Sequence, residues 1–353
     1  MIKIDIAIPV FNEEIYLREC LDSIINFEIP QGVSTTIFIV DGGSTDQSLG
    51  IANEFQQKYS NIEIFHNQKK IQSVAMNLVI NKGTGDYIMR LDAHSIFPVN
   101  YLKLCLETSL RKDADNVGGA AEVILIDKSY QAMVVQSIVT HKFGVGNAVR
   151  ARVSREESIV DTVPFGFFKK SIFAKVGLFD ERLVRCQDYE MNRRIKAFGG
   201  EVWCNPKINI KYYNQPNLIA FYKKQFLVEA PYNPYMWWLA SYSFKIRHGI
   251  TGLFTLGFLG GVALSSFSNV IFWTFMSIMI LYSLLAFLSS IQQSIRYEKV
   301  SFSFILVVGF FLLHFLHGLG VLKGVLLLMI RKSPVQKIRE PWPGALKYRI
   351  SVD

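Results

Sequence analysis

The chain opens with apolar residues at every second position from Ile4 to Val10, a period that predicts a β-strand. An apolar stripe at helical spacing follows, and it predicts a helix that starts from residues 12–14. The stripe comprises Tyr16, Leu17, Cys20, Leu21, Ile24 and Ile25. Further strands are predicted at 36–40, 63–65 and 87–91, with one helix ending near Tyr59 and another over 73–81. This alternating order predicts a mostly parallel sheet covered by helices.

Secondary-structure signals continue with less regularity to Tyr213. Two glycine pairs, Gly118-Gly119 and Gly199-Gly200, predict turns, and the second pair follows a helical pattern, as a helix stop does. We find no internal repeat and no low-complexity linker in this part of the sequence. The pattern therefore predicts one α/β domain over residues 1–230.

Aromatic and basic residues then gather between Leu218 and Gly249. Such a mixture before an apolar run is typical of a segment at the level of lipid headgroups, which we expect at 231–250. A packed surface of the preceding domain is the alternative. The residues are Tyr222, Lys223, Lys224, Phe226, Tyr232, Tyr235, Trp237, Trp238, Tyr242, Lys245 and Arg247.

Three apolar stretches follow, at 253–267, 270–289 and 302–330. A membrane span needs about 20 apolar residues, a length that the second and third stretches meet. The first is short and rich in glycine, and the third contains His314, His317 and Lys323, which makes two shorter pieces or a re-entrant element an alternative to one span. We expect two to four membrane helices within 251–332 and a basic tail over 333–353.

Basic residues lie on both sides of the third stretch. Arg296 and Lys299 precede it, and Arg331, Lys332, Lys337 and Arg339 follow it. The positive-inside rule places both groups on the cytoplasmic side, but a single span between them would put them on opposite sides. The number of spans therefore stays open.

Composition fits a protein that is partly in a membrane. Half of the 353 residues are hydrophobic, and the mean hydropathy of +0.23 is high for a wholly soluble enzyme and low for a polytopic transporter. The net charge of +9 favours anionic lipid or phosphorylated substrates as partners, and no nucleic-acid-binding signature accompanies it.

The four cysteines form no C-x-x-C pair, which favours a reducing compartment. We see no signal-peptide pattern and expect the first domain in the cytoplasm.

Two aspartates directly follow predicted strands. In open α/β sheets, ligands bind beyond the carboxyl ends of the strands, where Asp41 and Asp92 are expected. An ionised carboxylate only accepts hydrogen bonds, so Asp41 can take the imide N–H of a pyrimidine or a ribose hydroxyl. The alternative for Asp41 is a turn or helix-capping residue.

Asp92 and His94 together have the chemistry of a cation site. A carboxylate commonly holds Mg²⁺ or Mn²⁺ while diphosphate oxygens fill other positions, and a histidine suits Mn²⁺ better. The alternatives are a helix cap for Asp92, before a helix starting near Pro98, and a loop role for His94.

A third acidic cluster begins a predicted helix at Gln187-Asp188-Tyr-Glu190. The helix dipole favours an ionised carboxylate in the first turn, so Asp188 can serve as a general base. Dipole compensation is the alternative for Asp188. For Glu190 it is an ordinary pair with Arg194, four residues on.

Four segments in order resemble the motifs of family 2 glycosyltransferases with the GT-A fold. They are Ile8–Glu13 (the opening strand and turn), Val40–Asp46 (the nucleoside-binding aspartate), Gly85–His94 (the metal-binding D-x-D, here D-x-H) and Gln187–Glu190 (the E-D base motif, with Gln for Glu). The resemblance covers about Ile4 to Tyr213. Segments 163–170, 177–185 and 187–190 are similar to succinoglycan-type exopolysaccharide glycosyltransferases, which have C-terminal membrane helices and act on an undecaprenyl-diphosphate-linked oligosaccharide.

The resemblance implies a Rossmann-like GT-A catalytic domain followed by membrane helices. It implies an inverting hexosyltransferase that moves a sugar from a nucleotide diphosphate, with UDP expected, to a lipid-linked oligosaccharide in cell-surface polysaccharide synthesis. Asp188 would be the catalytic base, and Asp92 and His94 would hold Mn²⁺ or Mg²⁺. The implied nucleotide-sugar-binding residues are Pro9, Phe11, Glu13, Asp41, Asn77, Arg90 and Asp92, with Gln187, Glu190 and Arg193 as further candidates. By their charge, four basic residues are candidates for binding the diphosphate: Lys69, Lys70, Arg90 and Arg193. The alternative for each of the four is a solvated surface charge. The expected location is multi-pass in the inner membrane, with the catalytic domain cytoplasmic.

Other functions remain alternatives. A polyprenyl-phosphate hexosyltransferase would share the fold and donor but use a bare lipid phosphate as acceptor. A NAD-dependent oxidoreductase would need G-x-G-x-x-G after the first strand, where the chain reads Phe11-Asn-Glu-Glu-Ile. A non-catalytic membrane scaffold would not need three ordered carboxylates. No Q-x-x-R-W follows Gln215 or Gln225, which disfavours a processive polymer synthase and favours one sugar per acceptor.

Overall fold

The computed structural model describes residues 1–146 and 156–337. The described chain forms two compact units. The first contains residues 1–122 and 156–213, and the second contains 123–146 and 214–337. Of the expected basic tail, only 333–337 is described, including the short helix α14 (Pro334–Lys337), and Arg339 lies outside the described residues.

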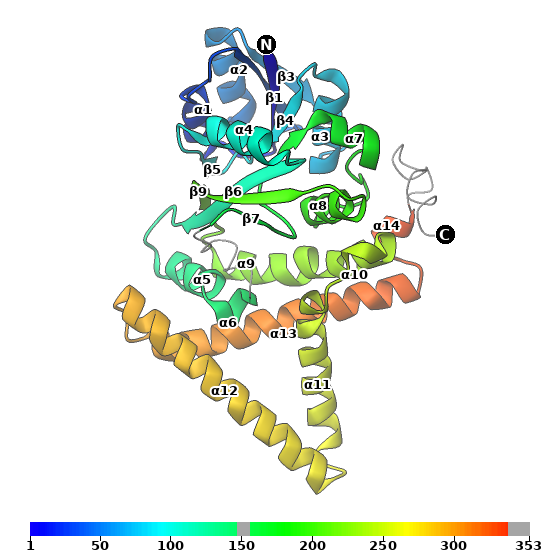
Figure 1. Cartoon of the computed structure of the whole chain (residues 1–353). Coiled ribbons are helices and arrows are strands. Elements are labelled where there is room, and N and C mark those ends of the chain that lie inside the picture. The colour runs from blue at the N-terminus through cyan, green and yellow to red at the C-terminus, as the bar shows by residue number, and fades with distance from the viewer. Residues whose placement is uncertain (147–155, 338–353) are drawn as a thin grey trace. The chain divides into compact units, whose positions relative to one another are not determined.

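The first unit is an α/β domain built on one mixed sheet (Figure 1). Its strands are β1 (Ile2–Val10), β2 (Val33–Asp41), β3 (Ile62–His66), β4 (Tyr87–Arg90), β5 (Ser95–Ile96), β6 (Asn116–Ile124), β7 (Ser158–Ile159), β8 (Phe167–Lys169) and β9 (Val202–Tyr213). Its helices are α1 (Leu17–Ile25), α2 (Ser48–Lys58), α3 (Gln72–Lys82), α4 (Tyr101–Lys112), α7 (Lys170–Val176) and α8 (Gln187–Ala197).

The strand order in the described sheet is β3-β2-β1-β4-β8-β6-β9-β5, with β7 paired to β9. The first four strands are parallel to one another, and β8 runs antiparallel to β4. Ile4 pairs with Thr35 on one side and with Tyr87 on the other, which fixes the central register. The predicted α/β sheet, and the order of its first seven elements, are therefore confirmed.

Alternate residues of β1 supply the two faces of the sheet. Ile4, Ile6 and Ile8 join a core with α1, α2 and α4, whereas Ala7 joins a second core with α3, α7 and α8. The period-two pattern at the start of the sequence is thus the pattern of a central strand covered on both sides. A core on each face holds the carboxyl ends of β1, β2 and β4 in fixed positions.

Two local predictions were wrong. The first helix begins at Leu17, not at residues 12–14, because the backbone of that loop hydrogen-bonds to the turn after β2. Gly118 and Gly119 lie within β6, not in a turn; a Cβ at either position would overlap Val163 or Ile208. Gly199 does end a helix, with a positive φ of 78° directly after the C-cap of α8.

The second unit is helical. It contains α5 (Tyr130–Thr140), α6 (Lys142–Val145), α9 (Leu218–Lys224), the π-helical turn η2 (Gln225–Glu229), α10 (Ala230–Leu239), α11 (Ile250–Leu264), α12 (Asn269–Tyr297) and α13 (Phe302–Met329). Short 3₁₀ turns, η3 (Ser241–Ser243) and η4 (Ile246–His248), link α10 to α11. A core between α5, α9 and α13 includes Ile138, Tyr222, Leu306 and Phe310.

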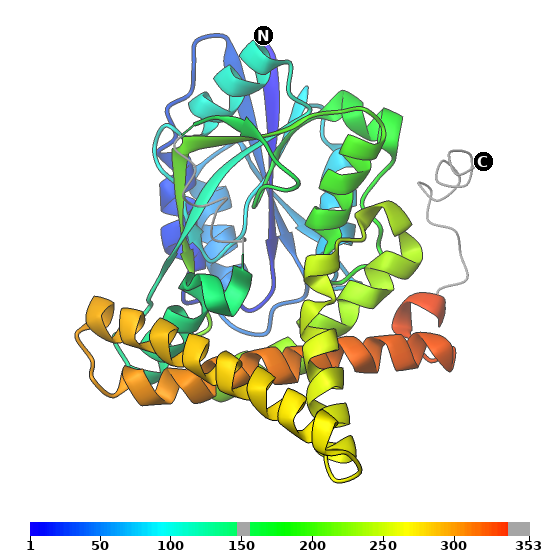
Figure 2. The ribbon, with the colours of Figure 1, turned by 60° about the horizontal axis from the view of Figure 1, so that its bottom comes forward.

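Two helices in the described chain, α12 and α13, are long and apolar enough to cross a membrane, and α11 is a shorter apolar helix. The third apolar stretch forms one continuous helix, α13, so it is not two shorter pieces. Figure 2 shows α11 and α12 meeting at a tip that projects away from α13. The expected division at residue 230, and the number of spans, stay predictions.

Candidate active site

The carboxyl ends of three neighbouring parallel strands form one edge of the sheet. Val10 at the end of β1 pairs with Asp41 at the end of β2, and Ala7 pairs with Arg90 at the end of β4. Asp92 follows β4 at the same edge, after Leu91, whose N–H donates to the carbonyl of Ala7. The sheet therefore brings the first two predicted aspartates to a common edge.

The loop after β1 is tied to the turn after β2. The N–H groups of Asn12 and Glu13 donate to the hydroxyls of Ser44 and Ser48, at 3.0 and 2.8 Å. The N–H of Thr45 donates back to Asn12 Oδ1 at 2.8 Å. These bonds, made in both directions, hold the two loops as one rigid rim.

Asp41 shapes its own turn. Its carboxylate accepts from the N–H of Gly43 at 2.9 Å and from the N–H of Ser44 at 3.1 Å. Gly43 has a φ of 76°, a conformation that favours glycine. The turn alternative for Asp41 is therefore correct, and binding a ligand would be an additional task of this buried carboxylate, since each oxygen can accept more than one bond.

Phe11 presents an exposed ring beside this turn. Its side chain is 47% exposed, and Lys70 Nζ lies 5.2 Å from the ring centroid. Lys70 also lies next to Gly43, where an added Cβ would meet its side chain at 3.6 Å. Pro9 is a half-buried residue of β1 itself. A flat aromatic face and an ammonium group thus stand next to Asp41.

Arg90 joins the other two predicted carboxylates. Its guanidinium contacts Asp92 Oδ1 at 2.6 Å and Asp188 Oδ2 at 2.9 Å. The Arg90 side chain is only 4% exposed and lies over the ring of Phe165, 5.9 Å from its centroid. Burial alone would lower the pKa of Arg90, but Asp188 and Asp92 raise it, so the group stays charged. One buried cation therefore fixes Asp92 and Asp188 around itself.

Asp188 has the environment of a general base. It lies in the first turn of α8, as predicted. Its Oδ1 is buried and has no hydrogen-bond partner in the described part of the chain. Burial raises the pKa of Asp188 to about 6, although Arg90 acts in the opposite direction. An unpaired carboxylate oxygen with a raised pKa is suited to accept a proton from a substrate.

A glutamine pair closes the ring around Arg90. Gln72, at the start of α3, donates to Asp92 Oδ1 at 2.9 Å, and Gln187 donates to Gln72 Oε1. Gln187 therefore helps to position Asp92 through Gln72. As an amide, its side chain does not serve as a general acid. The network links the starts of α3 and α8 to the end of β4.

His94 is held on both ring nitrogens. Nδ1 lies 2.9 Å from Glu13 Oε1, and Nε2 lies 3.1 Å from the hydroxyl of Tyr212. A metal bond to His94 would require one of these contacts to break.

The two side-chain hydrogen bonds that Asp92 accepts both fall on Oδ1, which leaves Oδ2 for a cation. The donor set thus fits a site with Asp92 as its one protein carboxylate, a common arrangement when diphosphate and water complete the shell. The described residues include no cluster of three metal-binding side chains.

Four other candidates serve mainly the fold. Asn77 is buried and hydrogen-bonds in both directions with the backbone of Phe179. Glu190 pairs with Arg194 in the core, as its alternative predicted, and the two side chains are 1% and 0% exposed. Arg193 pairs with Asp161 at 3.1 Å, and Lys69 pairs with Glu181 at 2.9 Å near the surface. These contacts tie the four side chains to neighbouring parts of the fold.

Three residues of the site were not identified from the sequence: Gln72, Phe165 and Tyr212. Phe165 precedes β8 and has a φ of 67°, and the pairing of β8 with β4 brings it beneath Arg90. Tyr212 reaches His94 because β9 pairs with β5, with Ser95 opposite Tyr212. Their positions depend on strand pairings between distant segments, and no local pattern encodes those.

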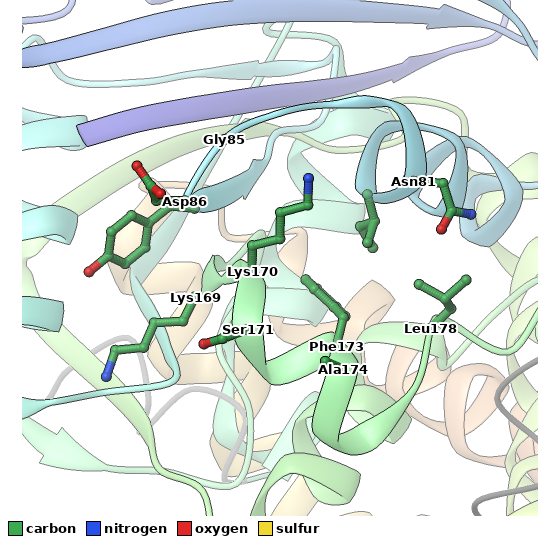
Figure 3. A pocket seen from close by; sticks show the side chains of 11 residues that line it. Asn81, Gly85, Asp86, Lys169, Lys170, Ser171, Phe173, Ala174 and Leu178 are labelled. Carbon is green, nitrogen blue, oxygen red and sulfur yellow. The ribbon is translucent and has the colours of Figure 1, made fainter. Parts of the chain in front are cut away.

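A surface cavity of about 710 Å³ lies elsewhere in this unit. Gly85, Asp86 and Tyr87 line it at the amino end of β4, together with Lys169 and Lys170 (Figure 3). Lys169 pairs with Asp113, and Lys170 donates to the carbonyl of Gly83. None of the predicted site residues lines this cavity. Its position, at the opposite end of β4 from Asp92, separates it from the candidate site.

The chain is similar to several known proteins. Residues 5–177 match the family model described as glycosyl transferase family 2. A dolichyl N-acetyl-α-D-glucosaminyl phosphate 3-β-D-2,3-diacetamido-2,3-dideoxy-β-D-glucuronosyltransferase from Methanococcus voltae is 30% identical over 227 residues, covering 63% of this chain and 70% of that protein. The succinoglycan biosynthesis protein ExoA from Rhizobium meliloti is 26% identical over 223 residues, covering 63% and 66%.

Among solved structures, residues 1–349 of TarS from S. aureus, in complex with UDP, align with a TM-score of 0.48 at 14% identity, covering 88% of this chain and 91% of that one. The family match ends at residue 177, before Asp188. The geometry around Arg90 therefore carries the argument for Asp188 independently of that match.

Proposed function

Since the chain belongs to glycosyl transferase family 2 and has the GT-A fold, we propose that it transfers a hexose with inversion from a UDP-sugar to a lipid-linked glycan. The observation that carries this proposal is the buried Arg90 bridge between Asp92 and Asp188, with Asp188 Oδ1 left without a partner. One carboxylate serves the leaving diphosphate, and the other serves the attacking hydroxyl.

The donor binds along the edge formed by β2, β1 and β4. Phe11 stacks on the base, and Asp41 accepts a hydrogen bond from the base or the ribose. Lys70, beside Phe11 and Gly43, lies within reach of negative charge on the nucleotide. Pro9 and Glu13 support this rim, Glu13 through its contact with His94.

The chemical step is a single displacement. Asp188 Oδ1 takes the proton of the acceptor hydroxyl while that oxygen forms a bond to the anomeric carbon. The bond from this carbon to the diphosphate breaks, UDP leaves with the electron pair, and the configuration inverts. Arg90 holds the Asp188 carboxylate through Oδ2, so that Oδ1 points to the acceptor.

Mg²⁺ or Mn²⁺ at Asp92 would neutralise charge on the leaving diphosphate. Arg90 and Gln72 orient Asp92 by occupying its Oδ1. His94 contacts Glu13 and Tyr212, and we do not assign it as a metal ligand.

The first relative supports a lipid-linked acceptor that already carries a sugar. Its name describes transfer to an N-acetylglucosaminyl phosphate on dolichol. The second relative is named for succinoglycan biosynthesis, which also supports a glycan product. A hydroxyl acceptor needs a base, as Asp188 would supply, whereas a bare lipid phosphate would need no proton removed at neutral pH.

The direct test is a panel of UDP- and GDP-sugars with purified protein, in MgCl₂, MnCl₂ or EDTA. Donor binding is scored by thermal shift, and transfer is scored against polyprenyl phosphate and against polyprenyl-diphosphate-linked oligosaccharide. We expect a UDP-sugar to bind, and transfer to the lipid-linked glycan alone. Transfer only to polyprenyl phosphate would favour the rival acceptor, and the absence of binding by every nucleotide sugar would overturn the proposal.

Transfer should fall as the pH drops through about 6. Because burial raises the pKa of Asp188 to about 6, the base is ionised above this pH and protonated below it. Below the pKa the rate should decrease by about tenfold per pH unit, since only the ionised fraction accepts a proton. Initial rates between pH 4.5 and 8 measure this limb, with samples returned to pH 7.5 to confirm reversibility. A rate that is flat down to pH 5 would contradict the assignment of the base.

A further inference from the structure

The basic residues around α13 conflict with a membrane crossing by that helix. Arg296 and Lys299 precede α13, and Arg331 and Lys332 follow it. The positive-inside rule assigns both groups to the cytoplasmic side, and a helix that crosses once would separate them. With 28 residues, α13 is about 42 Å long at the usual helical rise, so its length permits a crossing but does not require one.

One face of α13 is covered by protein along most of its length. Tyr222 of α9 donates to the carbonyl of Gly309 at 2.9 Å. A Cβ at Gly320 would meet Phe226 and Ala230, and a Cβ at Gly324 would meet Pro231 and Pro234. The chain from α9 through η2 to α10 therefore runs closely along α13, from Gly309 to Gly324.

This covering segment carries charges beside the middle of α13. Lys223 is exposed, and Lys224 and Glu229 form a pair at 3.6 Å with both side chains partly exposed. They lie between the contacts at Gly309 and Gly320. If α13 crossed a bilayer, these groups would be near its centre, where each Lys costs about 2.5–3.5 kcal/mol on insertion scales.

Away from this covered face, both ends of α13 expose apolar side chains, on either side of the place where α11 and α12 cross it. The exposed residues are Phe304, Ile305, Val308, Val325, Leu326, Met329 and Ile330, with exposures from 38% to 76%. A helix with one face against protein and exposed apolar side chains near both ends suits a position parallel to the membrane plane. There the exposed apolar side chains meet acyl chains while the covered face stays on the water side.

The α11–α12 hairpin supplies the part that enters the bilayer. Residues 249–295 contain no Asp, Glu, Lys or Arg, and the hairpin tip is formed by exposed apolar side chains such as Leu264, Phe267, Val270 and Trp273. Both helices cross α13: Thr255 donates to the carbonyl of Phe315, and Tyr282 contacts His314. Figure 1 shows α11 and α12 projecting from one side of α13, whereas α5, α9 and α10 lie on the other.

We propose that this helical unit enters a membrane from one side, with the α11–α12 hairpin inserted and α13 lying in the plane of the cytoplasmic headgroups. Arg296, Lys299, Arg331 and Lys332 then all face the anionic headgroups of the same leaflet, which removes the conflict in the charge pattern. The occupant of the exposed apolar surface at both ends of α13 is the acyl-chain region of that leaflet. This topology goes beyond the proposed function and does not depend on the sugar or the acceptor.

Cysteine labelling at the two ends of α13 tests the topology. Val300→Cys and Pro334→Cys place thiols at exposed positions before and after the helix, in the full chain expressed in a bacterial inner membrane. Of the native cysteines, Cys20, Cys105 and Cys204 are buried and Cys186 is partly exposed, so the parent chain gives the background. A membrane-impermeant maleimide is applied to intact spheroplasts, to inverted vesicles and, as the total, to detergent-solubilised protein.

We expect both variants to label fully in inverted vesicles and not above background in spheroplasts. Labelling of the two variants from opposite faces would show that α13 crosses and would overturn the proposal. Labelling of both only in spheroplasts, or of neither until detergent is added, would also overturn it. A thermal unfolding midpoint equal to that of the parent confirms that each variant is folded, and loss of nucleotide binding or transfer in the parent would leave the labelling result unchanged.

Discussion

Asp188→Asn should abolish most transfer while the protein still binds its donor. The substitution keeps the size and the hydrogen-bonding shape of the side chain but removes its ability to accept the acceptor's proton. General-base catalysis contributes about 10²–10⁴-fold to rates, so we expect a loss of that order in kcat. Because Asp188 contacts the acceptor and not the nucleotide in our proposal, the thermal shift caused by UDP should be nearly unchanged.

Glu107→Gln is the matched control, because it neutralises an exposed carboxylate on α4 and should retain parental rates. A second control is the parental protein at pH 4.5, where protonation of the base should lower transfer by roughly 30-fold. Transfer by Asp188→Asn at more than about a tenth of the parental rate, a loss below the usual range for a general base, would remove Asp188 from this role. Loss of the UDP thermal shift together with transfer would point to a defect in folding or donor binding.

The parallel half of the sheet was predictable because each of its elements has a strong local signal. The period-two pattern in β1, the buried runs of β2 and β4, and the apolar stripe of α1 each correspond to one buried surface. Asp41 and Asp92 could be placed at the sheet edge because they directly follow two of these strands. The predicted position of Asp188 in the first turn of a helix likewise rested on the local stripe of α8.

Contacts between distant segments were not predictable from these patterns. The loop at Asn12 does not continue into α1 because it bonds to the turn at Ser44, and nothing in residues 12–14 signals that partner. Gly118 looked like a turn residue because its close approach to Val163 cannot be seen in sequence. The sequence made Arg90 a candidate for binding the diphosphate. In the fold, Arg90 is a buried bridge between Asp92 and Asp188.

The structure also gives a role to Gln187, which stands where the E-D base motif has a glutamate. A glutamate at position 187 would place another negative charge beside Asp92 and Asp188. Gln187 instead donates to Gln72, which donates to Asp92, so the chain Gln187–Gln72–Asp92 is neutral at two of its three members. Arg90 therefore bridges two carboxylates and not three.

Arg90→Met should both destabilise the first unit and shift the pH dependence of any remaining transfer. Methionine preserves length and can keep the contact with Phe165, but it leaves Asp92 and Asp188 without their shared cation. Removing one partner of a buried ion pair costs about 3–5 kcal/mol. Since Arg90 lowers the pKa of Asp188 against the effect of burial, its loss should raise that pKa further, and the acid limb should move above pH 6.

Arg194→Met distinguishes this role from a purely structural one. Arg194 is also fully buried, but it pairs with Glu190 and donates to the carbonyls of Val176 and Leu178. We expect a similar loss of thermal stability in Arg194→Met, with the acid limb of its pH–rate profile at the parental position. If the two variants lost equal stability and both kept the parental acid limb, Arg90 would be a core residue with no influence on the base. A higher acid limb in Arg90→Met alone is the result that the bridge requires, because Arg90, and not Arg194, stabilises the ionised form of Asp188.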